Sequence, residues 1–310
     1  MTSLLRLSLL FFMALFSQCQ TRFTPDVPDA VTPSAARKNT VQEAVTPAVY
    51  KGVYIDGFAT ILGNATKENT LLDWCVKHGF NAISVYDLNT IMANGRYAQL
   101  AKFNKKAHAT YGIAQIAAVR GTAANFTQNA QYDAGRTDLQ ERFDVYNLEN
   151  EWWNNGPACD FGCYTGILQS LKSTAKAANP PMISEAYIGW FLNPTGQDLY
   201  QASTLVSNLD RILVHDYRKA PDFGYMQERL SYLGRAAQSQ NRVMDVIVLF
   251  SAESAFMFNY YSTKGQNKTF GDAYAAIVTQ FNAANFDGKA NIRLIGYQVF
   301  AYSFAKSARP

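Results

Sequence analysis

Three polar side chains stand at every second position of an otherwise apolar segment, FDVYNLENEWW, residues 143–153. Side chains alternate across a β-strand, so Asn147, Glu149 and Glu151 share the face opposite Leu148. Burying an unpaired carboxylate is costly, which predicts that this face lines a proton-sharing or substrate-facing site. Closely spaced carboxylates raise the pKa of one of the two, and that group then stays protonated as a general acid near neutral pH. This is the chemistry of glycoside hydrolysis.

The strands and helices that must position these residues form a repeating pattern along the chain. Short β-branched and aromatic runs alternate with polar or helical segments, which predicts strands and helices in turn. The predicted strands are 52–59, 81–88, 112–121, 143–153, 182–191, 211–217, 244–250 and 292–302. Eight such units predict an α/β fold, a single (β/α)8 TIM barrel over residues 47–310. An open doubly wound sheet is the alternative, but no Gly-rich phosphate fingerprint follows the first strand.

In a (β/α)8 barrel, chemistry takes place at the carboxyl ends of the strands. Polar residues gather at those predicted ends in this sequence. Besides the pair on the fourth strand, they are Asp56, Asp87, Arg120, Glu185, His215, Asp216 and Glu253. This clustering predicts a site at one end of the barrel.

Three short motifs resemble those of family 18 glycoside hydrolases, the chitinases and endo-β-N-acetylglucosaminidases. The segment DVYNLENE (144–151) is similar to the family's D-x-x-D-x-D-x-E on the fourth strand, with two of four positions matched. LVHD (213–216) keeps the Asp of M-x-Y-D, and GYQVF (296–300) keeps the Gly and an aromatic residue of G-x-M-x-W. The family's S-x-G-G is replaced by AAVRG (117–121).

The resemblance implies roles for individual residues. Glu151 is expected to protonate the glycosidic oxygen, and Glu149 to orient the N-acetyl group whose carbonyl attacks the anomeric carbon. His215 and Asp216 are expected to contact the acetamido group or the sugar, completing the catalytic set. The expected substrate-binding residues are Asn147, Tyr217, Phe300, Gln298, Trp152, Trp190 and Asp56, with Phe300 as the floor of the subsite. The longer side chain at 149, where the family has Asp, bears on activity because positioning errors of about 1 Å cost ~100-fold in rate.

Two other functions fit the same residues. In retaining glycosidases of the Glu/Glu clan, the fourth strand ends in Asn-Glu, here Asn150-Glu151, and the nucleophile follows the seventh strand, here Glu253. His215 and Tyr217 resemble that clan's H-x-Y. A catalytically degenerate carbohydrate-binding barrel is the third possibility, because exposed tryptophans near strand ends suit sugar stacking.

The N-terminus predicts export. Arg6 precedes an apolar run from Leu7 to Phe16, which is too short to span a bilayer and suits a secretory signal. Cys19 follows directly and resembles a bacterial lipobox cysteine, so residues 1–19 are predicted to be a lipoprotein-type signal peptide. Residues 20–46, rich in Pro, Thr, Ala and Ser, are predicted to form a flexible tether. The expected location is the bacterial cell envelope, lipid-anchored or otherwise periplasmic or secreted.

The charge and cysteine content restrict the classes of partner and cofactor that the chain is expected to bind. The net charge of +4 is spread without a basic stripe, which argues against nucleic-acid binding. Cys159 and Cys163 can form a loop disulfide after export. Zinc is the alternative, but none of the three histidines pairs with these cysteines by spacing. No cofactor or metal is expected. The expected partner is a glycan, whether chitin-like, peptidoglycan or N-linked, with membrane contact through the lipid anchor only.

Overall fold

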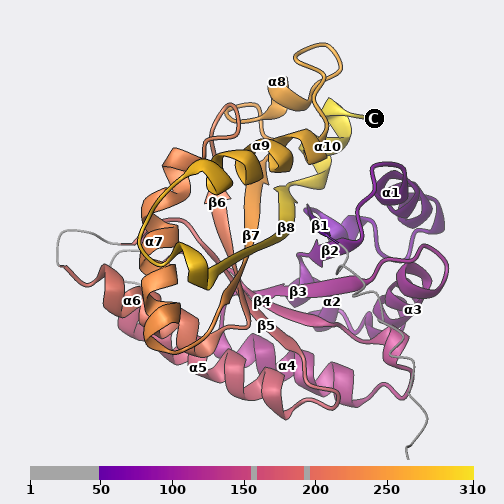
Figure 1. Cartoon of the computed structure of the whole chain (residues 1–310). Coiled ribbons are helices and arrows are strands. Elements are labelled where there is room, and N and C mark those ends of the chain that lie inside the picture. The colour runs from indigo at the N-terminus through magenta and orange to yellow at the C-terminus, as the bar shows by residue number, and fades with distance from the viewer. Residues whose placement is uncertain (1–48, 155–158, 192–195) are drawn as a thin grey trace, which may run out of the picture. The chain divides into compact units, whose positions relative to one another are not determined.

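Eight parallel strands close into a barrel, which confirms the predicted (β/α)8 architecture (Figure 1). The computed structural model describes residues 49–154, 159–191 and 196–310. The chain divides into Met1–Thr46 and Pro47–Pro310, and the barrel belongs to the second unit. The predicted signal peptide, Cys19 and the tether lie outside the described residues.

The strands follow one another around the barrel in chain order. They are β1 (Tyr50–Ile55), β2 (Ala82–Val85), β3 (Gln115–Arg120), β4 (Val145–Leu148), β5 (Ile183–Ile188), β6 (Arg211–Asp216), β7 (Met244–Ser251) and β8 (Ile292–Phe300). Pairing of β1 with β8 closes the ring. At this closure a Cβ on Gly296 would lie 1.9 Å from the Tyr50 carbonyl oxygen, so only glycine lets the two strands approach.

Helices surround the strands in Figure 1 and cover the outside of the barrel. They are α1 (Ala65–Lys77), α2 (Leu88–Ala93), α3 (Tyr97–Ala109), α4 (Ala123–Ala134), α5 (Phe161–Ala177), α6 (Asp198–Asn208), α7 (Phe223–Ser239), α8 (Phe258–Tyr261), α9 (Phe270–Ala283) and α10 (Tyr302–Ala308). Side chains cap several of them. Asn64, Thr122, Asp160 and Asp222 each accept a hydrogen bond from the first turn of their helix, which satisfies a backbone N–H left free there.

Two hydrophobic clusters lie on opposite faces of the strands. The larger lies between barrel and helices and includes Tyr146 and Leu148 of β4. The smaller fills the barrel and includes Tyr54, Leu213 and Leu249. Leu148 therefore faces the helices, as the alternation in the sequence predicts.

The fourth strand is shorter than its sequence pattern indicates. β4 ends at Leu148, and a turn begins at Glu151, whose carbonyl accepts from the backbone N–H of Asn154. The Glu149 N–H still bonds the Arg120 carbonyl, so the extended chain continues for one residue beyond the strand. Glu149 thus leaves the barrel in strand geometry, whereas Glu151 belongs to the turn that follows.

Candidate active site

The carboxyl ends of the strands converge on a mouth lined by carboxylates and aromatic rings. The ends of six strands, β2 and β4–β8, carry its residues, because each parallel strand delivers its last inward side chain to the same end of the barrel. These residues are Tyr86, Glu149, Glu151, Trp153, Tyr187, His215, Tyr217, Glu253 and Phe300. We call this set the mouth.

Glu149 is the most strongly perturbed acid in the mouth. Burial, reinforced by the nearby charge of Glu151, raises the pKa of Glu149 to about 7, although a hydrogen bond donated by the Tyr86 hydroxyl acts against that rise. A carboxyl with this pKa carries its proton for about half of the time at pH 7. Glu149 can therefore hold or release a proton near neutral pH.

Glu151 lies within the electrostatic reach of Glu149 and has its own neighbours. Its Oε2 accepts from Asn154 Nδ2 at 2.8 Å. Burial raises the pKa of Tyr187 far above 10, and a hydrogen bond with Glu151 adds to the rise. The Tyr187 hydroxyl therefore stays protonated and orients Glu151, as Tyr86 orients Glu149.

His215 lies in an aromatic enclosure at the end of β6. Its ring centroid is 4.8 Å from that of Tyr217, 5.5 Å from Trp190 and 5.6 Å from Tyr225. Burial and the nearby Arg229 lower the pKa of His215 to about 3, so the imidazole is neutral. Its Nδ1 is 3.4 Å from the Tyr187 hydroxyl, while its buried Nε2 has no hydrogen-bond partner within the part of the chain that the structure describes.

Aromatic rings form a continuous floor across the mouth. The Phe300 ring lies 5.9 Å from Tyr54, 6.3 Å from Tyr86 and 6.5 Å from Tyr217. Two hollows flank this floor. The β2–β4 hollow, of about 320 Å³, is lined by Tyr86 and Glu149 among others, and the β6–β7 hollow, of about 620 Å³, by Tyr217 and its neighbours.

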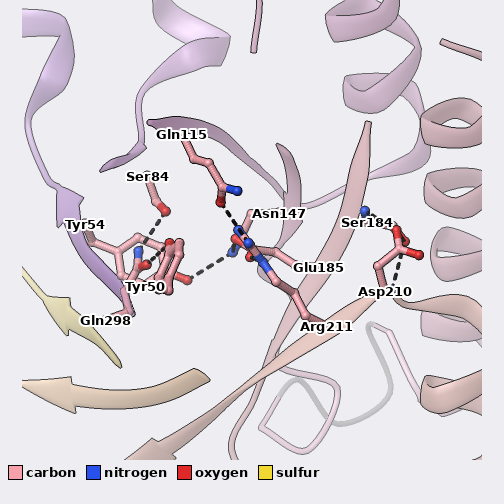
Figure 2. A network of polar contacts seen from close by, with 10 residues as sticks. All are labelled: Tyr50, Tyr54, Ser84, Gln115, Asn147, Ser184, Glu185, Asp210, Arg211 and Gln298. Atoms are coloured by element: carbon pink, nitrogen blue, oxygen red, sulfur yellow. Dashed lines mark hydrogen bonds and ion pairs between the residues drawn. The ribbon is translucent and has the colours of Figure 1, made fainter. Parts of the chain in front are cut away.

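A polar network fills the barrel beneath the mouth (Figure 2). Asn147 Nδ2 donates to Glu185 Oε1 at 2.7 Å and to the Tyr54 hydroxyl at 3.3 Å. Glu185 also forms an ion pair with Arg211, whose Nε lies 2.5 Å from its Oε2. Asn147 points into the barrel as predicted, but its partners are protein groups below the floor.

Gln298 belongs to the same interior layer. Its Oε1 accepts from the Tyr50 hydroxyl at 2.5 Å, and its Nε2 donates to Ser84 Oγ at 2.7 Å. A Cβ on Gly52 would lie 2.2 Å from Gln298 Oε1, so the glycine opens the space that this amide fills. Both polar ends of Gln298 are therefore occupied within the protein.

Three residues expected at the substrate are placed elsewhere, which corrects those predictions. Trp152 is 1% exposed and packs against Tyr164 of α5 with centroids 4.3 Å apart, because its large apolar ring is buried between barrel and helix. Asp56 accepts from the Ser303 backbone N–H at 3.0 Å and caps the start of α10. Asp216 pairs in register with Phe250 of the outer cluster, so its carboxyl points away from the mouth.

The other expected residues lie near the mouth. Trp190 is 42% exposed and stands beside His215. Glu253 follows β7, and its Oε2 accepts from Ser251 Oγ at 2.9 Å. Cys159 and Cys163 form a disulfide at the start of α5. Within the described ranges, His, Cys, Asp and Glu form no group of three or more suited to hold a metal ion.

Several residues of the site escaped sequence reasoning. Tyr54 and Tyr86 supply hydroxyls below and beside Glu149. Trp153, in contrast, is one of the tryptophans expected near strand ends, and it packs against Tyr187 with centroids 5.3 Å apart. Tyr54 and Tyr86 each stand an even number of residues from another inward-facing residue of the same strand. This spacing was the sequence signal that could have identified them. Arg229 lies on α7 rather than on a strand, so the strand pattern gave no indication of it.

Comparison with known proteins supports the fold. No family model and no curated protein matches the chain. The GH18 chitinase ChiB of Flavobacterium johnsoniae aligns at 12% identity over 83% of this chain and 88% of its own, with a TM-score of 0.44. A putative lyase/mutase from Burkholderia cenocepacia aligns at 11% identity over 84% and 78%, also at 0.44. An engineered protein reaches 0.50 at 12% identity, over 82% and 64%. At identities this low a likeness bears on the fold alone, and the barrel itself is shown by the pairing of its eight strands.

The buried Asp216 should make stability depend on pH. Burial raises its pKa from 3.8 to about 7; Oδ2 accepts from the Asp222 N–H, and Oδ1 has no partner. A raised carboxyl pKa stabilises the fold at pH values below about 4, and this contribution is lost as pH rises through 7. Relative to wild type, Asp216→Asn should therefore gain about 2–4 kcal/mol between pH 4.5 and pH 8.5. Urea unfolding at both pH values measures this change, and an equal difference at the two would contradict it.

Proposed function

We propose that this chain is an exported glycoside hydrolase that acts on glycans containing N-acetylated amino sugars. The observation that carries the proposal is the pair of acids that follows β4: burial and the charge of Glu151 raise the pKa of Glu149 to about 7, so Glu149 can hold a proton for Glu151 near neutral pH. The pair lies above an aromatic floor, and such rings favour the apolar faces of sugars. Export follows from the predicted signal and from Cys19 as the lipid attachment site.

In the proposed reaction the proton held by Glu149 passes to Glu151, which donates it to the glycosidic oxygen as the bond to the anomeric carbon breaks. The carbonyl oxygen of the substrate's own acetamido group forms a new bond to that carbon, and Glu149 holds the acetamido nitrogen. The leaving sugar departs with the proton from Glu151. Water then attacks the anomeric carbon and gives a proton back to Glu151, while the bond from that carbon to the acetamido oxygen breaks. Two successive displacements at the same carbon retain its configuration.

The neighbours of the two acids suit these roles. The Tyr86 hydroxyl fixes the end of the Glu149 side chain, which offsets the freedom of its extra methylene relative to Asp. Tyr187 and Asn154 orient Glu151 from two sides. Neutral His215 lies next to Tyr187, with its Nδ1 3.4 Å from the tyrosine hydroxyl.

Product analysis tests the proposal. The chain without residues 1–46 is incubated with chitooligosaccharides, peptidoglycan glycan strands and a high-mannose glycoprotein, and soluble products are identified by mass spectrometry. Cleavage on the reducing side of an N-acetylated sugar, with retention of configuration by NMR, is the expected result. Binding without cleavage would instead favour the carbohydrate-binding barrel.

The Glu/Glu-clan mechanism gives a different prediction for Glu253. That residue lies near enough to Tyr217 for its charge to add to the rise of the tyrosine pKa, as do those of Glu149 and Glu151. In substrate-assisted hydrolysis, Glu253→Gln should change kcat by less than about tenfold, because no covalent bond forms at this residue. A loss of 10²-fold or more, with a glycosyl adduct on Glu253 detected by mass spectrometry, would identify it as the nucleophile.

A further inference from the structure

The β6–β7 hollow adjoins the mouth and has a distinct chemistry. Its volume is about 620 Å³, and its wall includes Tyr217, Phe256, Arg218, Lys219 and Asp222. The Tyr217 and Phe256 rings are 5.1 Å apart, centroid to centroid. Tyr217 also packs against the Phe300 floor, so the hollow continues from the place where the proposed reaction occurs.

Charge in this wall is unbalanced. Arg218 and Lys219 supply two cations, and Asp222 is the only carboxylate in the described lining. Asp222 is already engaged, because its Oδ1 accepts from the Tyr225 N–H at the start of α7 and its Oδ2 lies 3.4 Å from Arg218 Nε. Among the described residues, Lys219 has neither a hydrogen bond nor an ion pair.

The cations are also held in place from behind. The Arg218 guanidinium lies 4.9 Å from the centroid of the Tyr225 ring, and Arg229 lies at the same distance from that ring. Arg229 is buried and donates to the carbonyls of Gly189 and Tyr225 rather than to a carboxylate. Arg218 and Lys219 therefore place positive charge beside Tyr217, which is also within reach of the charges of Glu149, Glu151 and Glu253 in the mouth.

We propose that the β6–β7 hollow binds a sugar that carries a carboxylate, with the sugar ring against Tyr217 and Phe256 and the carboxylate at Lys219 and Arg218. The inference rests on the proposed function and narrows its substrate class. Among N-acetylated glycans it selects those whose amino sugar bears an acidic ether, as muramic acid does in peptidoglycan. Neutral chitin-like chains lack the group that these cations would bind.

Binding to an inactive variant tests the inference without turnover. In the Glu151→Gln background, calorimetry compares three tetrasaccharides: one alternating N-acetylglucosamine with N-acetylmuramic acid, its carboxyl-reduced analogue and chitotetraose. The acidic ligand should bind about 3- to 20-fold more tightly than its reduced analogue, the range expected for two exposed ion pairs. This preference should disappear in 0.5 M NaCl, because salt screens exposed charges.

Charge variants locate the effect. Arg218→Gln/Lys219→Gln should abolish the preference while leaving the Kd for chitotetraose within about twofold, and Lys219→Arg should preserve it. Lys102→Gln, at an exposed lysine of α3, controls for net charge and should change neither. The inference would be overturned if the Glu151→Gln protein with Arg218 and Lys219 intact bound the acidic ligand and its reduced analogue equally, or bound neither. A clear preference without cleavage by the active chain would keep the inference and reject the hydrolase.

Discussion

Replacing Glu151 by glutamine is expected to lower kcat on N-acetylated glycans by about 10²- to 10⁴-fold, the usual contribution of a positioned general acid. Glutamine keeps the size and the hydrogen bond to Asn154 but has no proton to donate to the glycosidic oxygen. KM should change little, since the side chain contributes more to the transition state than to the ground state. Steady-state kinetics on a chitooligosaccharide with a chromogenic leaving group measure both.

The leaving group offers an internal control for this prediction. A substrate whose leaving group departs without protonation, such as a dinitrophenyl glycoside, should recover most of the lost rate, because the missing acid is no longer required. Asn154→Asp serves as the matched variant: it alters a neighbour of Glu151 without removing the acid and should retain more activity than Glu151→Gln. Full activity of Glu151→Gln on both substrates would reject every enzymatic role given to this residue.

Replacing Glu185 by glutamine should lower the free energy of unfolding by about 3–5 kcal/mol, because it leaves the buried Arg211 without its counter-charge. Glu185 is fully buried and Arg211 nearly so, and the ion pair lies inside the barrel (Figure 2). Among the described residues, one other hydrogen bond of the guanidinium reaches a side chain, from Nη1 to Gln115 Oε1 at 2.8 Å. Urea unfolding followed by tryptophan fluorescence measures the change.

A double variant distinguishes the loss of a partner from general damage to the core. Glu185→Leu/Arg211→Met removes both charges, and apolar replacement of a buried pair is often neutral or stabilising. The double variant should therefore recover most of the stability lost in Glu185→Gln. A cost for Glu185→Gln below about 1 kcal/mol, the range of an exposed pair, would contradict the prediction.

The barrel was predictable because its signal is repeated eight times. Each strand carries a β-branched run of the right length, and chain order fixes the neighbours once the ring closes. Asn147 was also placed correctly inside the barrel, since alternation holds as long as the chain remains extended. The same rule assigned Leu148 to the outer layer.

The alternation of inward and outward side chains no longer predicts the direction of a side chain where the strands end. Trp152 lies within the turn that begins at Glu151, so its direction is set by packing on α5 rather than by the strand. At Asp216 the strand persists and the alternation itself places the carboxyl outside, but the family motif suggested contact with the sugar. Contacts between distant residues, such as Tyr86 with Glu149, depend on the closed ring and have no local sequence signal.

Tyr54 has a consequence for engineering, because it lies between two regions with different tasks. Below it, Glu185 and Arg211 hold the interior, and above it the proposed chemistry takes place on side chains from loops and strand ends. A library that randomised Trp190, Lys219 and the residues around Phe256 would leave the interior pair untouched. Selection for a different glycan could therefore proceed on a scaffold of constant stability, with Tyr54 as the lowest position to vary.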